Sequence, residues 1–197
     1  MADFIQNTRM REKQVRLFIA LLLPDELKAR LGDLINELRP LSGAIKWVDQ
    51  KNLHLTLKFI GERPESDIDR IIQILTKVIE GYGKMTCPVR GTGGFPNLRN
   101  PRVIWVGLEE TATVAEIARL LNKKLQNLGI KKENKAFSPH LTLGRIKKRD
   151  NFAELADHME SLNFDAGPVI LDRVALVKST LTPQGPVYEN IKVFELE

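Results

Sequence analysis

The tetrapeptide His-Leu-Thr-Leu occurs twice in this chain of 197 residues, at 54–57 and again at 140–143. The copies lie 86 residues apart, close to half of the chain from residue 15 to the C-terminus. Alternate residues of a β-strand project to opposite faces, so each copy predicts a strand with an imidazole and a hydroxyl about 6–7 Å apart on one face and two leucines on the other. The repeat therefore predicts two related halves, each with a half-buried strand.

The rest of the chain alternates between strand-like and helix-like segments. Apolar or alternating runs predict strands over 15–23, 45–60 (interrupted at 49–52), 85–90, 102–108, 137–146, 171–181 and 187–196. Helical spacing of apolar residues predicts helices over 24–39, 66–79, 113–128 and 152–162. Paired strands between some helices favour an α+β fold with antiparallel sheets over a doubly wound parallel sheet.

Helix ends and one glycine-rich segment carry local signals. Ser66 with Asp69 and Thr113 with Glu116 have the spacing of capping boxes, and Gly129 is expected to end the third helix. The glycine-rich segment 91–94 lies in a predicted polar loop, 91–101. It lacks the spacing of a dinucleotide-binding loop and no helix follows it directly, so a flexible turn is the better interpretation.

The N-terminal segment has features of a secretion signal but does not complete one. Residues 1–14 show no clear period and are expected to form a flexible leader before a single bilobal catalytic domain, 15–197. The apolar run 17–23 follows basic residues, yet Pro24 and two acidic residues come next without a cleavage pattern. The run is also far shorter than the roughly 20 residues of a membrane span. The single cysteine, Cys87, cannot form an internal disulfide, so the chain is expected to be cytoplasmic. It is also expected to be a monomer that does not bind a membrane.

Charge and chemistry both point to a phosphate-bearing partner. The net charge of +5 favours an anionic partner. If the two motifs face one groove, one neutral imidazole can take a proton from water while a protonated one gives a proton to the leaving oxygen of a phosphate ester. The threonine hydroxyls can donate to phosphate oxygens. No metal or other cofactor is needed, and a zinc site would require further ligands that do not accompany the motifs. The third histidine, His158, is expected at the surface.

The paired H-x-T motifs resemble those of the 2H phosphoesterase superfamily. The flanking sequences are similar to those of its RNA 2′,3′-cyclic phosphodiesterase branch, also called 2′-5′ RNA ligases, over about residues 15–197. The segments that carry this resemblance are Lys46-Trp47-Val48, Phe59-Ile60-Gly61-Glu62, Phe137-Ser138-Pro139, Gly144-Arg145 and 179–183.

The resemblance implies a bilobal fold of two pseudo-symmetric halves with both motifs in a central cleft. It also implies hydrolysis of RNA ends bearing a 2′,3′-cyclic phosphate to a 2′-phosphate, together with the 2′-5′ RNA ligase activity that some members of the branch have. By motif position, His54 would be the proton donor to the departing 3′ oxygen and His140 the proton acceptor that activates water. Thr56 and Thr142 would bind the phosphate. The sequence leaves the reverse assignment of acid and base open.

Two residues in the flanks are implied as base-binding positions. Phe59 and Arg145 each lie five residues after their histidine, and an aromatic ring with a guanidinium plane can sandwich an RNA base. Strict alternation would place both on the strand face opposite the histidines, so the interpretation requires a bend or a bulge in each strand. Gly144 is a candidate for the irregular position in the second strand, and the first strand contains no comparable residue. The alternative places Phe59 in the core and Arg145 at a strand end.

Two other functions are compatible with the same residues. A non-catalytic module could bind nucleotides or RNA through the same H-x-T pairs. A 2′-5′ oligonucleotide phosphodiesterase could use the same residues on another substrate.

Overall fold

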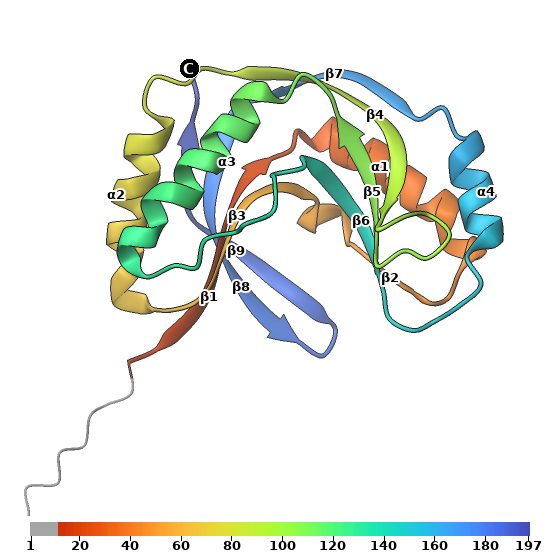
Figure 1. Cartoon of the computed structure of the whole chain (residues 1–197), viewed down its shortest axis with the longest axis horizontal. Coiled ribbons are helices and arrows are strands. Elements are labelled where there is room, and N and C mark those ends of the chain that lie inside the picture. Colours follow the sequence, from red (N-terminus) through yellow and green to blue (C-terminus); the bar gives the residue numbers. More distant parts are fainter. Residues whose placement is uncertain (1–11) are drawn as a thin grey trace, which may run out of the picture.

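Two antiparallel β-sheets form the framework of the chain, and the computed structural model describes residues 12–197 (Figure 1). The four-stranded sheet has the order β3 (His54–Pro64), β1 (Gln14–Leu22), β8 (Arg173–Thr182), β9 (Gly185–Glu195). The five-stranded sheet has the order β2 (Ile45–Trp47), β6 (His140–Ile146), β5 (Val103–Leu108), β4 (Met85–Phe95), β7 (Asp165–Leu171). Neighbouring strands are antiparallel throughout, which confirms the predicted α+β class.

Each sheet is covered by two helices, and each sheet with its helices forms one lobe of the molecule. The α-helices are α1 (Asp25–Leu38), α2 (Ile68–Ile79), α3 (Ala112–Lys124) and α4 (Ala153–Ser161). Helices α2 and α3 pack on each other and α3 on β3, whereas α1 contacts β7 and α4 contacts β4 (Figure 1). The predicted bilobal arrangement is confirmed. Each lobe takes strands from both halves of the sequence, and one continuous apolar core runs through both.

The helices were predicted well, and their N-terminal caps were not. Helices α1 and α4 lie within one residue of the predicted ranges at both ends, and α2 begins two residues later than predicted. Helix α3 ends at Lys124, and a 3₁₀ turn (Leu125–Leu128) continues it to Gly129, which has a left-handed conformation, φ 70°. The capping boxes are wrong, because the N-cap residues are Asp67 and Thr111 and neither makes a side-chain cap hydrogen bond.

Several strand bounds differ from the prediction for identifiable reasons. The glycine-rich segment 91–94 is not a turn but part of β4. A Cβ on Gly93 would lie 2.2 Å from the Trp105 ring, so glycine allows the two strands to pair closely. The predicted strand over 171–181 corresponds to β8, whereas β7 was missed because Gly167 and Pro168 interrupt its pattern. Strand β6 begins only at His140.

The expected leader falls almost entirely outside the described residues. Residues 1–11 are not described, and β1 begins at Gln14, where it pairs with Pro64 of β3. Among residues 12–197, no helix has both the length and the apolar character needed to cross a bilayer.

Candidate active site

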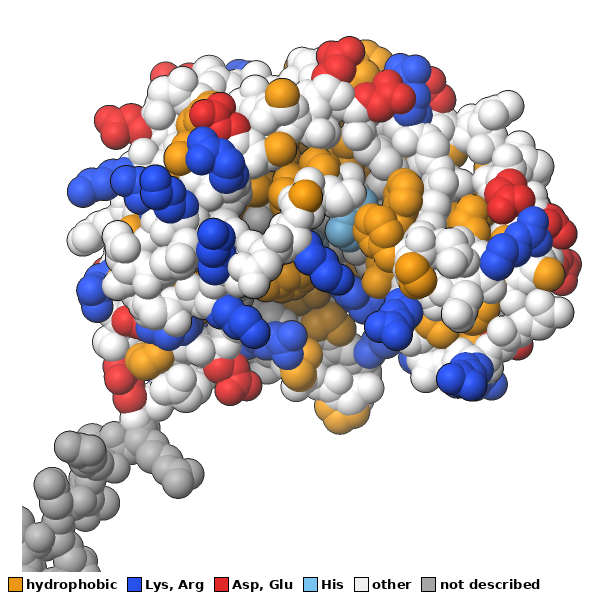
Figure 2. Space-filling model, viewed as in Figure 1, with side chains coloured by type: hydrophobic (Ala, Val, Ile, Leu, Met, Phe, Trp, Pro, Cys, Tyr) orange, Lys and Arg blue, Asp and Glu red, His pale blue; other side chains and the backbone are white. Residues whose placement is uncertain are grey.

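The strands that carry the two motifs, β3 and β6, contact each other where the lobes meet. A cavity of about 540 Å³ lies beside the first motif, and another of about 720 Å³ lies beside the second. Both cavities are bordered by the same four residues: Thr56, Phe59, Thr142 and Arg145. They therefore form one cleft, visible as a hollow with basic side chains around its mouth (Figure 2). With His54 in the first cavity and His140 in the second, the structure brings all six predicted site residues together.

A β-bulge in each motif strand turns the fifth residue after the histidine into the cleft. In the ladder between β1 and β3, Thr56 pairs with Ala20 and Lys58 with Ile19, so Leu57 is an extra residue. In the ladder between β5 and β6 the register shifts in the same way, and Leu143 is the extra residue. Both leucines are the fourth residue of their tetrapeptide. The bulges that the base-binding interpretation required are thus present, the second one residue before Gly144.

Burial along the two strands shows the effect of the bulges. Leu57 and Lys58 are buried in succession, and Phe59 then lies on the cleft face with 53% of its surface exposed. The second strand repeats the pattern, with Gly144 buried and Arg145 exposed. The core position weighed for Phe59 is therefore wrong.

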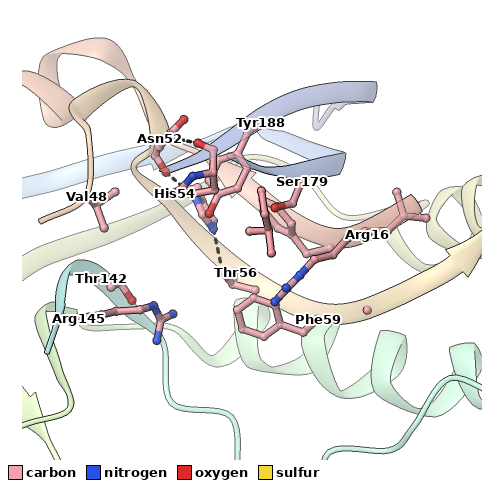
Figure 3. A pocket seen from close by; sticks show the side chains of 15 residues that line it. Arg16, Val48, Asn52, His54, Thr56, Phe59, Thr142, Arg145, Ser179 and Tyr188 are labelled. Carbon is pink, nitrogen blue, oxygen red and sulfur yellow. Dashed lines mark hydrogen bonds between the residues drawn. The ribbon is translucent and has the colours of Figure 1, made fainter. Parts of the chain in front are cut away.

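His54 is held by backbone, hydroxyl and aromatic neighbours (Figure 3). Its Nδ1 lies 2.7 Å from the carbonyl oxygen of Asn52, and its Nε2 lies 2.9 Å from Oγ1 of Thr56. A carbonyl only accepts, so Nδ1 carries the proton and Nε2 is the acceptor of the neutral ring, with the threonine hydroxyl as its donor. The rings of Phe18 and Tyr188 lie 4.8 Å and 5.5 Å from the imidazole.

The environment of His54 favours its neutral form. Burial is the main cause that lowers its pKa from the ordinary value, because a charged imidazole loses solvation there. The bond to the Asn52 carbonyl acts in the opposite direction, and the nearby Arg145 guanidinium lowers the pKa further.

His140 repeats the backbone arrangement of His54. Its Nδ1 lies 2.7 Å from the carbonyl oxygen of Ser138, again two residues before the histidine. Phe95 meets the ring edge-on at 5.0 Å. The same tautomer follows, with Nε2 as the acceptor. Among residues 12–197 the Thr142 hydroxyl makes no hydrogen bond, which leaves it available to a ligand in the cleft.

Several cleft residues were missed by the sequence analysis. The first cavity is also lined by Arg16, Ser179 and Tyr188, from β1, β8 and β9 (Figure 3). Phe18 of β1 lines it too. Each looks like an ordinary strand residue in the sequence, and only strand pairing brings it to the motifs. The Asn52 amide also donates to the carbonyl of Pro186 (3.1 Å), which ties the turn before the first motif to β9.

The third histidine lies away from the cleft. His158 of α4 is 2.8 Å from the carboxylate of Glu37 on α1, at the surface, as expected. Within the described part of the chain, no three or more His, Cys, Asp or Glu side chains cluster as a metal site would require.

A family model described as LigT-like phosphoesterase matches the chain twice, at residues 21–105 and 106–188. The double match agrees with the pseudo-symmetry that the repeated tetrapeptide predicts.

Two curated relatives carry the name RNA 2′,3′-cyclic phosphodiesterase. The protein from Methanothermobacter thermautotrophicus is 35% identical over 93% of this chain and 100% of its own length. The protein from Methanocaldococcus jannaschii is 37% identical over 90% of this chain and 99% of its own length.

Solved structures show the same fold. The protein TT0787 of Thermus thermophilus superposes with a TM-score of 0.79 at 32% identity and covers 92% of this chain and 97% of its own. Escherichia coli LigT, solved in complex with 3′-AMP, has a TM-score of 0.75 at 22% identity and covers 93% of this chain and 99% of its own.

Proposed function

Because the chain belongs to the LigT-like phosphoesterase family, we propose that it hydrolyses RNA ends bearing a 2′,3′-cyclic phosphate and leaves a 2′-phosphate. Relatives that cover nearly the whole chain are named for that activity. In this proposal residues 15–197 act as one catalytic domain, as a cytoplasmic monomer without a cofactor.

One observation carries the proposal. Two imidazoles border a single cleft, and each has its Nδ1 held by a backbone carbonyl and an Nε2 that can accept a proton. In neutral His54 this nitrogen accepts a hydrogen bond from the Thr56 hydroxyl. The threonines of both motifs lie where the cavities meet, the position for a phosphate between the two histidines.

The proposed reaction is an in-line displacement at phosphorus. The oxygen of a water molecule attacks phosphorus as Nε2 of His140 takes the proton of that water. The bond from phosphorus to the 3′ oxygen breaks, and protonated His54 gives its Nε2 proton to that oxygen. The Thr142 hydroxyl donates a hydrogen bond to a non-bridging oxygen and stabilises the charge that develops there. The Thr56 hydroxyl does the same, because protonated Nε2 of His54 no longer accepts its proton.

The lowered pKa of His54 is a specific observation in favour of the reverse assignment. A histidine that is neutral at rest is ready to act as the base, whereas acting as the acid requires it to gain a proton when the anionic substrate binds. A cyclic substrate with sulfur in place of the bridging 3′ oxygen separates the two, because a thiolate leaves without a proton. Substitution of the acid will be rescued on this substrate, and substitution of the base will not.

Phe59 and Arg145 are proposed to hold the terminal base. Both are exposed on the cleft face and border both cavities, so a base can lie between the ring and the guanidinium plane. The same cleft would serve the joining of 2′-5′ linkages.

The central test is hydrolysis of a nucleoside 2′,3′-cyclic phosphate and a cyclic-ended oligonucleotide in excess chelator. His54→Ala and His140→Ala are each expected to lower the rate about 10²- to 10⁴-fold, the usual contribution of a general acid or base. His158→Ala, which removes the surface histidine, is the matched control and should retain full activity. Full activity in both cleft variants would refute the proposal, and loss of activity on chelation would instead support a metal site.

The same assay separates the rival functions. Tight binding of a cyclic end that is never cleaved would support a non-catalytic RNA-binding module. Faster turnover of 2′-5′-linked dinucleotides than of cyclic ends would support a 2′-5′ oligonucleotide phosphodiesterase.

A further inference from the structure

Lys58 is the most deeply buried charged side chain among residues 12–197, with 1% of its side chain exposed. It lies in β3 between the bulged Leu57 and the exposed Phe59, and it is one of the residues that border the larger cavity. Its counterpart in the second motif strand is Gly144, so the bulge itself does not require a charge at this position. Burying an ammonium group costs free energy, and a protein with an apolar side chain of similar size at that position is often equally stable. The charge therefore calls for another explanation.

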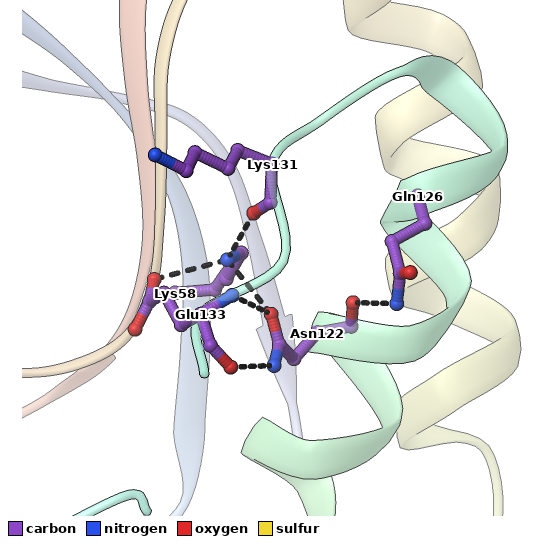
Figure 4. A network of polar contacts seen from close by, with 5 residues as sticks. All are labelled: Lys58, Asn122, Gln126, Lys131 and Glu133. Atoms are coloured by element: carbon purple, nitrogen blue, oxygen red, sulfur yellow. Dashed lines mark hydrogen bonds and ion pairs between the residues drawn. The ribbon is translucent and has the colours of Figure 1, made fainter. Parts of the chain in front are cut away.

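All three protons of the ammonium group have acceptors (Figure 4). Nζ donates to Oδ1 of Asn122 at 2.9 Å, to the carbonyl of Lys131 at 2.9 Å and to Oε1 of Glu133 at 3.0 Å. The Asn122 side chain in turn accepts from the backbone N–H of Glu133 and donates to its carbonyl, both at 2.9 Å. Lys58 and Asn122 thus clamp residues 131–133 against β3 and α3.

The clamped residues begin the segment that leads to the second histidine. Residues 131–139 contain no helix or strand, and positions 133 and 135–138 line the larger cavity. Among residues 12–197, the hydrogen bonds of this segment are those at Lys131 and Glu133 and the one from His140 to the Ser138 carbonyl. The clamp therefore fixes the start of the segment that carries the Ser138 carbonyl, and Phe137, next to Ser138, packs against the apolar core.

We propose that Lys58 is a positioning residue for His140. It joins the strand of the first motif to the segment before the second, and it holds the Ser138 carbonyl where it keeps the proton of His140 on Nδ1. The inference rests on the proposed function for its catalytic consequence. The positioning itself is a property of the folded chain and can be measured without substrate.

The test is Lys58→Met, which keeps the apolar stem and removes the ammonium group. The ¹⁵N shifts of the imidazole nitrogens at alkaline pH report which nitrogen carries the proton, and His54→Ala and His140→Ala assign the signals. We expect His140 to become a mixture of both tautomers while His54, held by the Asn52 carbonyl, keeps its Nδ1 proton. We expect kcat to fall about ten- to a hundredfold, as small displacements of a catalytic group do.

Lys178→Met is the matched control. It removes an ammonium group that pairs with Glu189 at 3.1 Å on the β8–β9 hairpin, so both histidine tautomers and kcat should stay as in the wild type. A folded Lys58→Met protein with an unchanged His140 tautomer would overturn the inference. Equal disturbance of both histidines would also overturn it, because that indicates general loosening.

A second variant decides the matter if Lys58→Met does not fold. Glu133→Ala removes one acceptor of the clamp from a half-exposed position. It should shift the tautomer equilibrium of His140 in the same direction by a smaller amount. An unchanged His140 tautomer in this variant would refute the positioning role. If the wild type cleaves no cyclic end, the proposed function fails while the tautomer measurement still tests the inference.

Discussion

The backbone around each histidine decides what that histidine can do. The carbonyls of Asn52 and Ser138 lie two residues before their histidines, and each fixes the proton on Nδ1. The aromatic rings around His54 exclude water from one side of it, so its neutral form is favoured. The functional unit therefore includes the residue two positions before each histidine in addition to the three residues of the H-x-T motif.

Burial of neutral His54 makes the stability of the fold depend on pH. Its pKa is lowered in the folded chain, so the unfolded chain binds the proton more tightly, with a reference pKa of about 6.5. The stability that neutral His54 contributes is complete above pH ~6.5 and is lost as the pH falls toward the folded pKa. Urea unfolding from alkaline to mildly acidic pH should show the difference in free energy between wild type and His54→Gln shrinking over that window. A difference that stays constant or grows would contradict the assigned environment.

Phe59 should contribute to binding and not to stability. Phe59→Ala is expected to raise the KM for a cyclic nucleotide about 5- to 150-fold, because stacking on an aromatic ring contributes about 1–3 kcal/mol per base. The thermal midpoint should barely change, since the ring is 53% exposed. Ile170→Ala is a control of matched exposure (52%) in β7, outside both cavities. An unchanged KM in Phe59→Ala would remove this residue from the proposed base site.

The sequence identified the residues of the site from the repeat and its flanks, but not their surroundings. The two histidines and two threonines follow from the repeated tetrapeptide, and strand alternation places each pair on one face. Arg16, Phe18 and Tyr188 could not be predicted, because β1 and β9 reach the cleft through pairings between distant segments. No local pattern marks such a pairing.

The spacing of apolar residues predicted the positions of the helices well. It predicted the bounds of the strands less reliably. A bulge depends on how two strands pair, so Leu57 gives no signal in a sequence that reads as strict alternation. The glycines of β4 read as a turn, although one of them admits the Trp105 ring. Both errors concern contacts between strands, which periodicity within one strand does not contain.

The glycine in β4 provides a test at this scale. Gly93→Ala places a methyl group 2.2 Å from the Trp105 ring, and the strands must separate to accommodate it. We expect a loss of about 1–3 kcal/mol in the free energy of unfolding, typical of overpacking. Gly43→Ala is the matched control, because nothing lies within 4 Å of its added Cβ. Equal stabilities of the two variants in urea unfolding would contradict the close packing of β4 on β5.

The whole molecule should unfold as one unit despite its two lobes. The apolar core is continuous between them, and the chain crosses from one sheet to the other repeatedly. Both tryptophans, Trp47 and Trp105, lie in the five-stranded sheet, so their fluorescence reports on that lobe alone. Circular dichroism reports on both lobes. The two probes should give the same midpoint in urea, and an earlier or later fluorescence transition would show that the lobes unfold separately.

The place of β1 has a consequence for how the protein is made. This strand leaves the ribosome before every other described strand, yet it lies inside its sheet between β3 and β8. Its second neighbour is synthesised about 150 residues later. Until β8 emerges, the growing chain keeps an apolar strand with one open edge, the kind of edge that recruits other chains. The sheet can therefore close only after β8 has emerged, and the nascent chain depends on protection of that edge while the residues between β1 and β8 are synthesised.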